Sequence, residues 1–212
     1  MKILTVDDHP LFSHGLKESL TSTRPDFEVI SIQDPQEALT FAKSHNDLDM
    51  LILDLTMPQM DGISLMRALI ARDIYLPVVI MSASEDILLL QQALSLGAVS
   101  ILSKLWSIEQ LVDSIDKIGQ GETVIPNNIQ KSLANMSKFS EENTQSILSK
   151  RQLEILKMVQ AGLSNSGIAS VLYISELTVK SHLQTIFRIL GAKNRVDSVR
   201  KAESLNIFAK KS

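Results

Sequence analysis

The stretch Met50-Leu51-Ile52-Leu53-Asp54 decides the fold of this chain. Four consecutive apolar residues are typical of a strand buried on both faces, as the central strands of parallel sheets are. Asp54 follows directly, and Met57-Pro58 and Asp61-Gly62 then break the strand and begin a helix. Open parallel sheets bind ligands at the carboxyl ends of their strands. The stretch therefore predicts a doubly wound sheet and a site at its edge.

The N-terminus repeats this pattern. Residues 3–6 are a second short apolar strand, and Asp7-Asp8 ends it. If the two strands are neighbours, three carboxylates gather at one edge, and their mutual repulsion favours a bound divalent cation. Oxygen ligands of this kind suit Mg²⁺. Asp7, Asp8 and Asp54 are therefore the expected metal ligands, with His9 a loop residue beside them.

Strand and helix patterns alternate five times over residues 1–118. The expected strands cover residues 3–6, 27–32, 50–53, 78–81 and 99–102, and a helical pattern follows each of them. This alternation predicts an α/β fold, a doubly wound five-stranded parallel sheet with helices on both faces. Two later strands end near Ser82 and Lys104. Each of these polar residues alone is most simply a surface group, but together with the carboxylates they form the set needed to accept and hold a phosphoryl group.

The amino-acid composition limits the classes of protein to which the chain can belong. The 212 residues allow one large or two modest domains, and 44% hydrophobic and 21% charged residues are ordinary for a soluble protein. The absence of cysteine excludes disulfides and thiolate metal sites. No signal peptide follows Met1, and no apolar run reaches the ~18 residues of a membrane span, so we expect a cytoplasmic protein with no membrane partner.

The net charge of −3 conceals an asymmetry along the chain. Residues 1–118 hold 8 Lys and Arg against 17 Asp and Glu, a balance of −9, whereas residues 119–212 hold 13 against 7, a balance of +6. A basic second part favours nucleic acid as its partner. Glycines and Pro126 indicate a linker over residues 119–147, within which residues 128–136 could form a helix docking on either neighbour. We therefore expect domains at residues 1–118 and 148–212.

Four helical patterns follow residue 148. The second and third are joined by a three-residue turn at residues 173–175, and the third, residues 176–190, is basic, which is the helix-turn-helix arrangement. Its apolar positions at helical spacing predict a core face of Val179, Leu183, Ile186 and Leu190. The outward residues are then Lys180, Ser181, Gln184 and Arg188. Lys and Gln can bind base edges in the major groove, although a solvated helix face is the simpler alternative.

Residues 1–118 resemble a response-regulator receiver domain, a flavodoxin-like fold. They carry V-D-D-H-P, L-D-L-T-M-P-x-M-D-G, M-S-A and G-A-x-x-x-L-x-K in order. The resemblance implies that Asp54 is the phosphoacceptor and that Asp7, Asp8 and the Thr56 backbone carbonyl help hold Mg²⁺. It also implies that Ser82 moves onto the phosphoryl group as a switch and that Lys104 pairs with its oxygens.

One departure from that family concerns the switch. Ile101 stands where receivers usually place Tyr or Phe as the partner of the moving hydroxyl, and Leu105 replaces a common Pro. We expect the phosphorylation chemistry to survive both changes.

Residues 148–206 resemble a LuxR-type helix-turn-helix domain. They carry L-S-x-R-Q-x-E-I-L, G-L-S-N-x-x-I-A, I-S-x-x-T-V-K-x-H-L and I-x-x-x-L-G-x-x-N-R. The two resemblances imply a NarL/FixJ-class response regulator, with a sensor histidine kinase and double-stranded DNA as partners and a homodimer when phosphorylated. Lys180, Ser181 and Gln184 would read bases. The expected phosphate contacts are Ser164, Asn165, Thr178, Lys193 and Arg195.

Three hypotheses follow. The first is a phosphorylation-controlled transcription regulator with no enzymatic role beyond self-phosphorylation and self-dephosphorylation. The second is a phosphohydrolase of the haloacid-dehalogenase type, which would need an acid two residues after Asp54, where this chain has Thr56. The third is a DNA-binding regulator that does not depend on phosphate, for which Ile101 is the motive.

Overall fold

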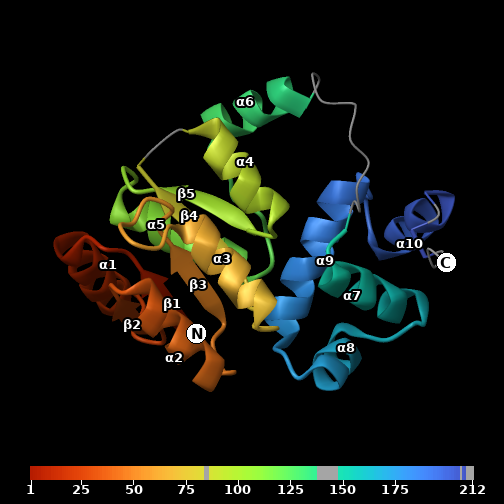
Figure 1. The fold of residues 1–212 in the computed structure, drawn as a ribbon, viewed down its shortest axis with the longest axis horizontal. Coiled ribbons are helices and arrows are strands. Elements are labelled where there is room, and N and C mark those ends of the chain that lie inside the picture. The colour runs from red at the N-terminus through yellow and green to blue at the C-terminus, as the bar shows by residue number, and fades with distance from the viewer. Residues whose placement is uncertain (84–85, 138–147, 206, 209–212) are drawn as a thin grey trace. The chain divides into compact units, whose positions relative to one another are not determined.

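The structure is a computed structural model that describes residues 1–83, 86–137, 148–205 and 207–208 (Figure 1). The chain forms two compact units, Met1–Ser140 and Glu141–Ser212. The first contains β1 (Lys2–Val6), α1 (Pro10–Thr23), β2 (Glu28–Ile32), α2 (Pro35–Ser44), β3 (Met50–Leu53), α3 (Gly62–Ala71), β4 (Val78–Ser82), α4 (Ile87–Ser95), β5 (Ser100–Ser103), α5 (Ile108–Gly119) and α6 (Asn127–Ser137). The second contains α7 (Lys150–Gln160), α8 (Asn165–Leu172), α9 (Glu176–Leu190) and α10 (Arg195–Ser204).

The sheet of the first unit is parallel throughout, with the strand order β2-β1-β3-β4-β5. All four residues of β3 are buried, as the apolar run predicts for a central strand. Val6 of β1 pairs with Leu53 of β3. Because both strands end there, Asp7 and Asp54 leave the sheet at the same edge.

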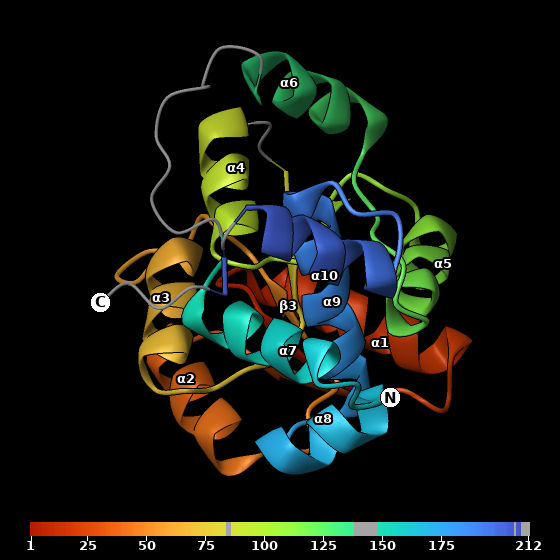
Figure 2. The ribbon, with the colours of Figure 1, turned by 90° about the vertical axis from the view of Figure 1, so that its right-hand side faces the viewer.

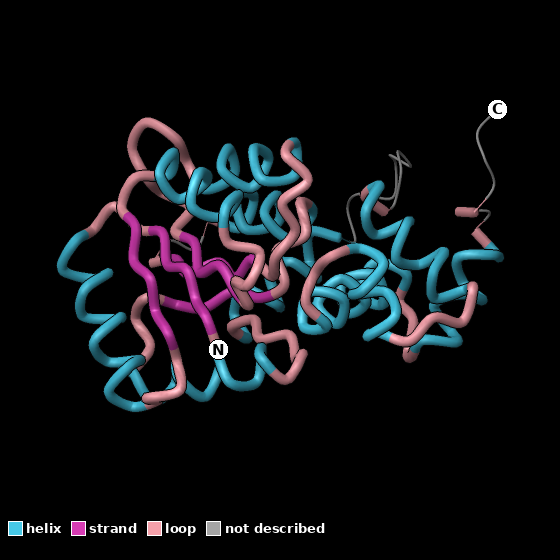
Figure 3. Tube along the Cα trace, turned by 90° about the horizontal axis from the view of Figure 1, so that it is seen from below, coloured by secondary structure: helices cyan, strands magenta, loops and turns pink. Residues whose placement is uncertain are grey.

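Helices cover both faces of this sheet, as Figures 2 and 3 show. One face packs against α1 and α5 through a core that includes Leu16, Leu20 and Ile115. The other packs against α2, α3 and α4 through a core that includes Leu39, Met66 and Leu90. The five-stranded doubly wound fold is therefore confirmed.

The helices begin where the sequence provides caps. Asp61 and Asp86 accept hydrogen bonds from the first turns of α3 and α4, and Ser107 forms a capping box with Gln110 at the start of α5. The N-cap of α4 is Asp86, and residues 84–85 before it lie outside the described residues. Gly97 then ends that segment in a left-handed conformation, with a φ of 108°.

The chain after α5 remains part of the first unit. The Ile101 N–H donates to the Val124 carbonyl over 2.8 Å, and the Val124 N–H donates to Ser100 Oγ over 3.0 Å, so this segment covers the outer edge of β5. α6 then packs against α4, and its Ile129 is buried in the core of the first unit. The sequence leaves the docking partner of this helix open; the structure places it on the first unit because its apolar side chains pack there.

The second unit is helical in its described residues, residues 148–205 and 207–208. Ser149 forms a capping box with Gln152, and Ser164 caps α8. The four predicted core residues of α9 are all buried: Val179, Leu183, Ile186 and Leu190. In the part of the chain that the structure describes, no helix is both long and apolar enough to span a membrane.

Candidate phosphoacceptor site and nucleic-acid interface

Three carboxylates meet at the edge of the sheet, as the strand ends predict. Asp7, Asp8, His9 and Asp54 each present a ligand atom, and these four atoms lie within 4.8 Å of one another. Asp7 and Asp54 are buried, whereas Asp8 is partly exposed and His9 exposed. The cluster joins the ends of β1 and β3, since the Asp54 N–H donates to the Val6 carbonyl over 2.9 Å.

Lys104 neutralises part of this charge. Its Nζ lies 2.6 Å from Asp7 Oδ2 and 2.7 Å from Asp54 Oδ2, and its side chain is only 11% exposed. Burial alone would lower the pKa of Lys104, but the hydrogen bonds to Asp54 and Asp7 outweigh burial and raise the pKa above its ordinary value. The ammonium is therefore charged and bridges the two buried carboxylates.

The other residues expected at this edge lie close by. The Thr56 N–H donates to Asp54 Oδ1 over 3.2 Å, which orients the carboxylate. Ser82 is buried at the end of β4, and its carbonyl accepts a hydrogen bond from the Lys104 N–H over 3.0 Å. The adjacent strands β4 and β5 thus bring a hydroxyl and a lysine to the same edge as the carboxylates.

The donor set fits a divalent cation. With all three carboxylates ionised, three negative charges and one Lys104 ammonium leave a net charge of −2. The buried Asp8 Oδ1 accepts no hydrogen bond from the described residues, although His9 Nδ1 lies 3.0 Å away. Oxygen ligands with an unsatisfied lone pair are what Mg²⁺ requires. Asp7, Asp8 and Asp54 are the residues that could hold it.

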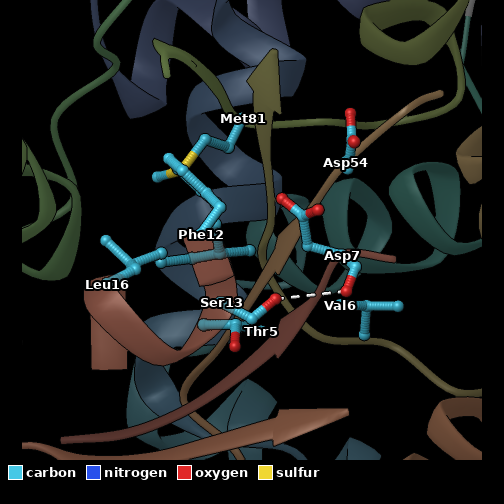
Figure 4. A pocket seen from close by; sticks show the side chains of 9 residues that line it. Thr5, Val6, Asp7, Phe12, Ser13, Leu16, Asp54 and Met81 are labelled. Carbon is cyan, nitrogen blue, oxygen red and sulfur yellow. Dashed lines mark hydrogen bonds between the residues drawn. The ribbon is translucent and has the colours of Figure 1, made fainter. Parts of the chain in front are cut away.

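The sequence predicts His9 beside the site without a role, and it does not single out Phe12. His9 Nδ1 lies 3.1 Å from Asp7 Oδ1 and 3.0 Å from Asp8 Oδ1, so this loop residue contacts both carboxylates of the acidic pair. Phe12 lines a small cavity of about 10 Å³ together with Asp7 and Asp54 (Figure 4). The sequence signal for His9 is its position directly after the acidic pair, and that for Phe12 is its place in the first turn of α1.

Gly62 is required by close packing behind the phosphoacceptor candidate. A Cβ at Gly62 would lie 2.4 Å from the Asp54 carbonyl oxygen and 2.8 Å from Leu55 Cα. We expect Gly62→Ala to lower the free energy of unfolding of the first unit by about 1–3 kcal/mol, since backbone must move. The matched control is Gly15→Ala in α1, where a Cβ meets nothing within 4 Å; it should stabilise by up to about 1 kcal/mol. Urea unfolding followed by Trp106 fluorescence measures both, and equal effects would contradict this role for Gly62.

Ile101 occupies the expected switch position inside the core. It is fully buried in the middle of β5 and packs in the cluster shared with α4. Its N–H is bonded to the Val124 carbonyl. The residue therefore contacts the core and the segment that leads to α6.

The candidate recognition helix α9 has its predicted outward residues on one arc. At about 100° per residue, Ser181, Gln184 and Arg188 lie opposite the core face, and Lys180 lies at the border of this arc. Lys180 and Arg188 are exposed and Gln184 is partly exposed, but Ser181 and the phosphate candidate Thr178 are buried. The Thr178 Oγ1 lies 2.9 Å from Ser175 Oγ at the start of the helix. Contact of these residues with DNA stays a prediction.

The remaining phosphate candidates gather at the ends of two helices. Ser164 is exposed and caps α8, and Lys193 is exposed just before α10. Arg195 is engaged within the domain, since its Nη1 donates to Asn165 Oδ1 over 3.0 Å and its Nη2 to the Leu163 carbonyl. Arg195 and Asn165 therefore also join α10 to the start of α8, whether or not they contact phosphate.

We expect His182 to make the stability of the second unit depend on pH. Burial, with a smaller effect of the nearby Arg151 charge, lowers the pKa of His182 from 6.5 to about 4. The unfolded chain therefore binds more protons than the folded one between these values, and stability falls as the pH falls from 6.5 to 4. We expect a loss of about 3 kcal/mol in the second unit, at 1.36 kcal/mol per pKa unit.

His182→Gln should remove most of this loss. Circular dichroism of denaturant unfolding between pH 7 and 4 measures it, with Trp106 fluorescence reporting the first unit separately. His14→Gln is the control, because His14 is exposed on α1 of the other unit. If the free energy of unfolding of the second unit depends on pH equally in His182→Gln and in the wild type, His182 is not the group responsible.

Two family models match the two units. The model for the response regulator receiver domain matches residues 3–116, and that for bacterial regulatory proteins of the luxR family matches residues 146–202. The chain belongs to the response regulators: it is a two-component transcription regulator with a receiver domain and a LuxR-type DNA-binding domain, not an enzyme of the classical kind.

Known proteins resemble the chain over nearly its full length. It is 36% identical to the glycerol metabolism activator of Pseudomonas putida, over 98% of this chain and 97% of that protein. It is 34% identical to the nitrate/nitrite response regulator protein NarP of Escherichia coli, over 92% and 91%. Among solved structures, RcsB of Salmonella enterica bound to a promoter has a TM-score of 0.58 at 23% identity, covering 97% of this chain and 98% of that one, which shows the fold alone.

Proposed function

We propose that Asp54 accepts a phosphoryl group from a sensor histidine kinase and that this modification controls DNA binding. The observation that carries the proposal is the buried Asp54 carboxylate held 2.7 Å from the Lys104 ammonium, among two further carboxylates. A carboxylate oxygen of Asp54 forms a bond to phosphorus as the phosphorus–nitrogen bond of the kinase phosphohistidine breaks. The product is an acyl phosphate on Asp54.

Each residue at the edge has a part in this transfer. The Thr56 N–H orients Asp54 through its contact with Oδ1, and Lys104 moves from bridging two carboxylates to pairing with the phosphoryl oxygens. Mg²⁺ held by Asp7, Asp8 and Asp54, with the Thr56 carbonyl, would neutralise the charge that builds on those oxygens. Ser82 lies one strand away and would donate its hydroxyl to the new group.

The added charge would bias the receiver between two states and promote a homodimer. One helix-turn-helix domain buries too little surface for tight specific binding, whereas two domains on paired half-sites multiply the affinity. In this proposal Lys180, Ser181 and Gln184 read bases in the major groove. Arg188 is a further outward contact, and the phosphate contacts are Ser164, Asn165, Thr178, Lys193 and Arg195.

A second candidate is a regulator that binds DNA without phosphate control. It is favoured by Ile101, which is fully buried and lacks the aromatic ring that receivers usually move. In that case protein contacts at the receiver would replace phosphorylation. Regulation of target promoters by Asp54→Asn as by the wild type would favour this candidate.

The proposed switch is tested by oligomeric state. Light scattering of the full chain with Mg²⁺ and beryllofluoride, which mimics the phosphoryl group, should show a monomer becoming a dimer. Asp54→Asn should stay monomeric under the same conditions. A wild-type mass that does not change with beryllofluoride contradicts dimerisation by phosphorylation.

A further inference from the structure

The ring of Phe12 lies against Lys104, the lysine proposed to pair with the phosphoryl oxygens. The Lys104 Nζ lies over the Phe12 ring, 4.8 Å from its centroid. The same nitrogen contacts Asp7 and Asp54 at 2.6 and 2.7 Å. The ammonium is therefore confined between two carboxylates and one aromatic face.

Phe12 also lines two hollows of the first unit, as Leu16 does. One is the cavity of about 10 Å³ that it lines with Asp7 and Asp54, where Figure 4 shows Phe12 beside Leu16 and Met81. The other is a groove of about 280 Å³ between α1 and α5, which Phe12 lines together with Lys104 and Trp106. The aromatic side chain thus borders both the cavity beside the buried carboxylates and the groove beside Lys104.

From this arrangement we infer that Phe12 is a positioning residue for Lys104 in phosphoryl transfer. An ammonium on a flexible four-carbon stem is strongly hydrated, and water would compete for it once it leaves the carboxylates. The face of an aromatic ring attracts a cation and excludes water from that side. Phe12 therefore keeps the Lys104 Nζ at the site while its partners change from carboxylate to phosphoryl oxygens.

Phe12 touches no reacting atom in this role. It acts through Lys104 alone, so its removal should slow transfer without weakening the binding of Mg²⁺, whose candidate ligands are the carboxylates. The inference rests on the proposed function, since the step it assists is phosphorylation of Asp54. Two variants distinguish the effect of the aromatic face from that of apolar side-chain volume. Phe12→Tyr keeps an aromatic face, and Phe12→Leu keeps an apolar side chain without one.

The test measures phosphorylation of the full chain by acetyl phosphate at saturating Mg²⁺. We expect Phe12→Leu to lower the limiting rate about fivefold, as loss of one cation–π contact predicts, and Phe12→Tyr to stay within about twofold of the wild type. The Mg²⁺ affinity, followed by fluorescence of Trp106, should be the same in all three proteins. A full rate in Phe12→Leu, a Phe12→Tyr variant as slow as Phe12→Leu, or weakened Mg²⁺ binding in parallel with the rate would overturn the inference.

A second readout does not depend on phosphorylation. Trace labelling of lysines with acetic anhydride, quantified by peptide mass spectrometry, reports how accessible the Lys104 nitrogen is. Labelling of Lys104 should rise several-fold in Phe12→Leu and stay low in Phe12→Tyr, while the exposed Lys157 serves as the internal reference. If the wild type takes up no phosphoryl group, the proposed function fails, and this labelling still decides the role of Phe12: equal labelling of Lys104 in the wild type and Phe12→Leu rejects it.

Discussion

Replacing Asp54 with Asn is expected to lower phosphoryl uptake by at least about 100-fold while leaving the fold intact. The amide has nearly the same shape as the carboxylate but is not a nucleophile at neutral pH. It also removes one of the two anions that hold Lys104. Intact-protein mass spectrometry after incubation with acetyl phosphate and Mg²⁺ measures the occupancy.

The control for Asp54→Asn is Asp47→Asn. Asp47 is a surface carboxylate, 65% exposed, whose partner is Lys2 rather than Lys104. It should leave phosphorylation unchanged. If the phosphorylated fraction of Asp54→Asn equals that of the wild type, the phosphoacceptor is a different residue of the chain.

The second large effect is expected at Lys180, on the exposed face of α9. Truncation to Ala should weaken binding to a specific site by about 1–3 kcal/mol, which is roughly 5- to 150-fold in Kd, because a contact to a base edge would be lost. Binding to unrelated DNA should weaken far less. Fluorescence anisotropy at fixed salt measures both, with a site selected by the wild-type chain from a random-sequence pool.

Lys157→Ala is the matched control for this change. Lys157 is another exposed lysine of the same domain, on α7 rather than α9. Its loss should change affinity only through general electrostatics, and equally for all DNA sequences. Equal losses for both variants on the selected site would remove Lys180 from the base-reading residues.

Much of the fold could be predicted from the sequence, because its signals are local. The apolar run at β3, the Asp and Ser caps and the glycines at segment ends each report on a few neighbouring residues. Together these signals indicate five βα units, which agrees with the five strands of the sheet. The docking of α6 depends on long-range packing of residues such as Ile129 against the receiver core, which no local pattern reveals.

The candidate site, like the fold, could be predicted from the sequence only in part. Position at a strand end identifies Asp7, Asp54 and Lys104 as neighbours, since parallel strands end at one edge. The pairing of Lys104 with both carboxylates and with the Phe12 ring depends on side-chain geometry, so it emerges only from the structure. For the same reason, the sequence predicts Arg195 and Asn165 as two separate phosphate contacts, whereas the structure shows them hydrogen-bonded to each other.

The most direct test of the account compares DNA affinity in the two states of the receiver. The full chain is titrated onto its selected site with Mg²⁺ alone and with Mg²⁺ plus beryllofluoride, for the wild type and for Asp54→Asn. We expect beryllofluoride to tighten wild-type binding by at least about tenfold, as pairing of two domains on one site requires, and to leave Asp54→Asn unchanged. Equal wild-type affinity in the two conditions would contradict control of DNA binding by the phosphoacceptor site.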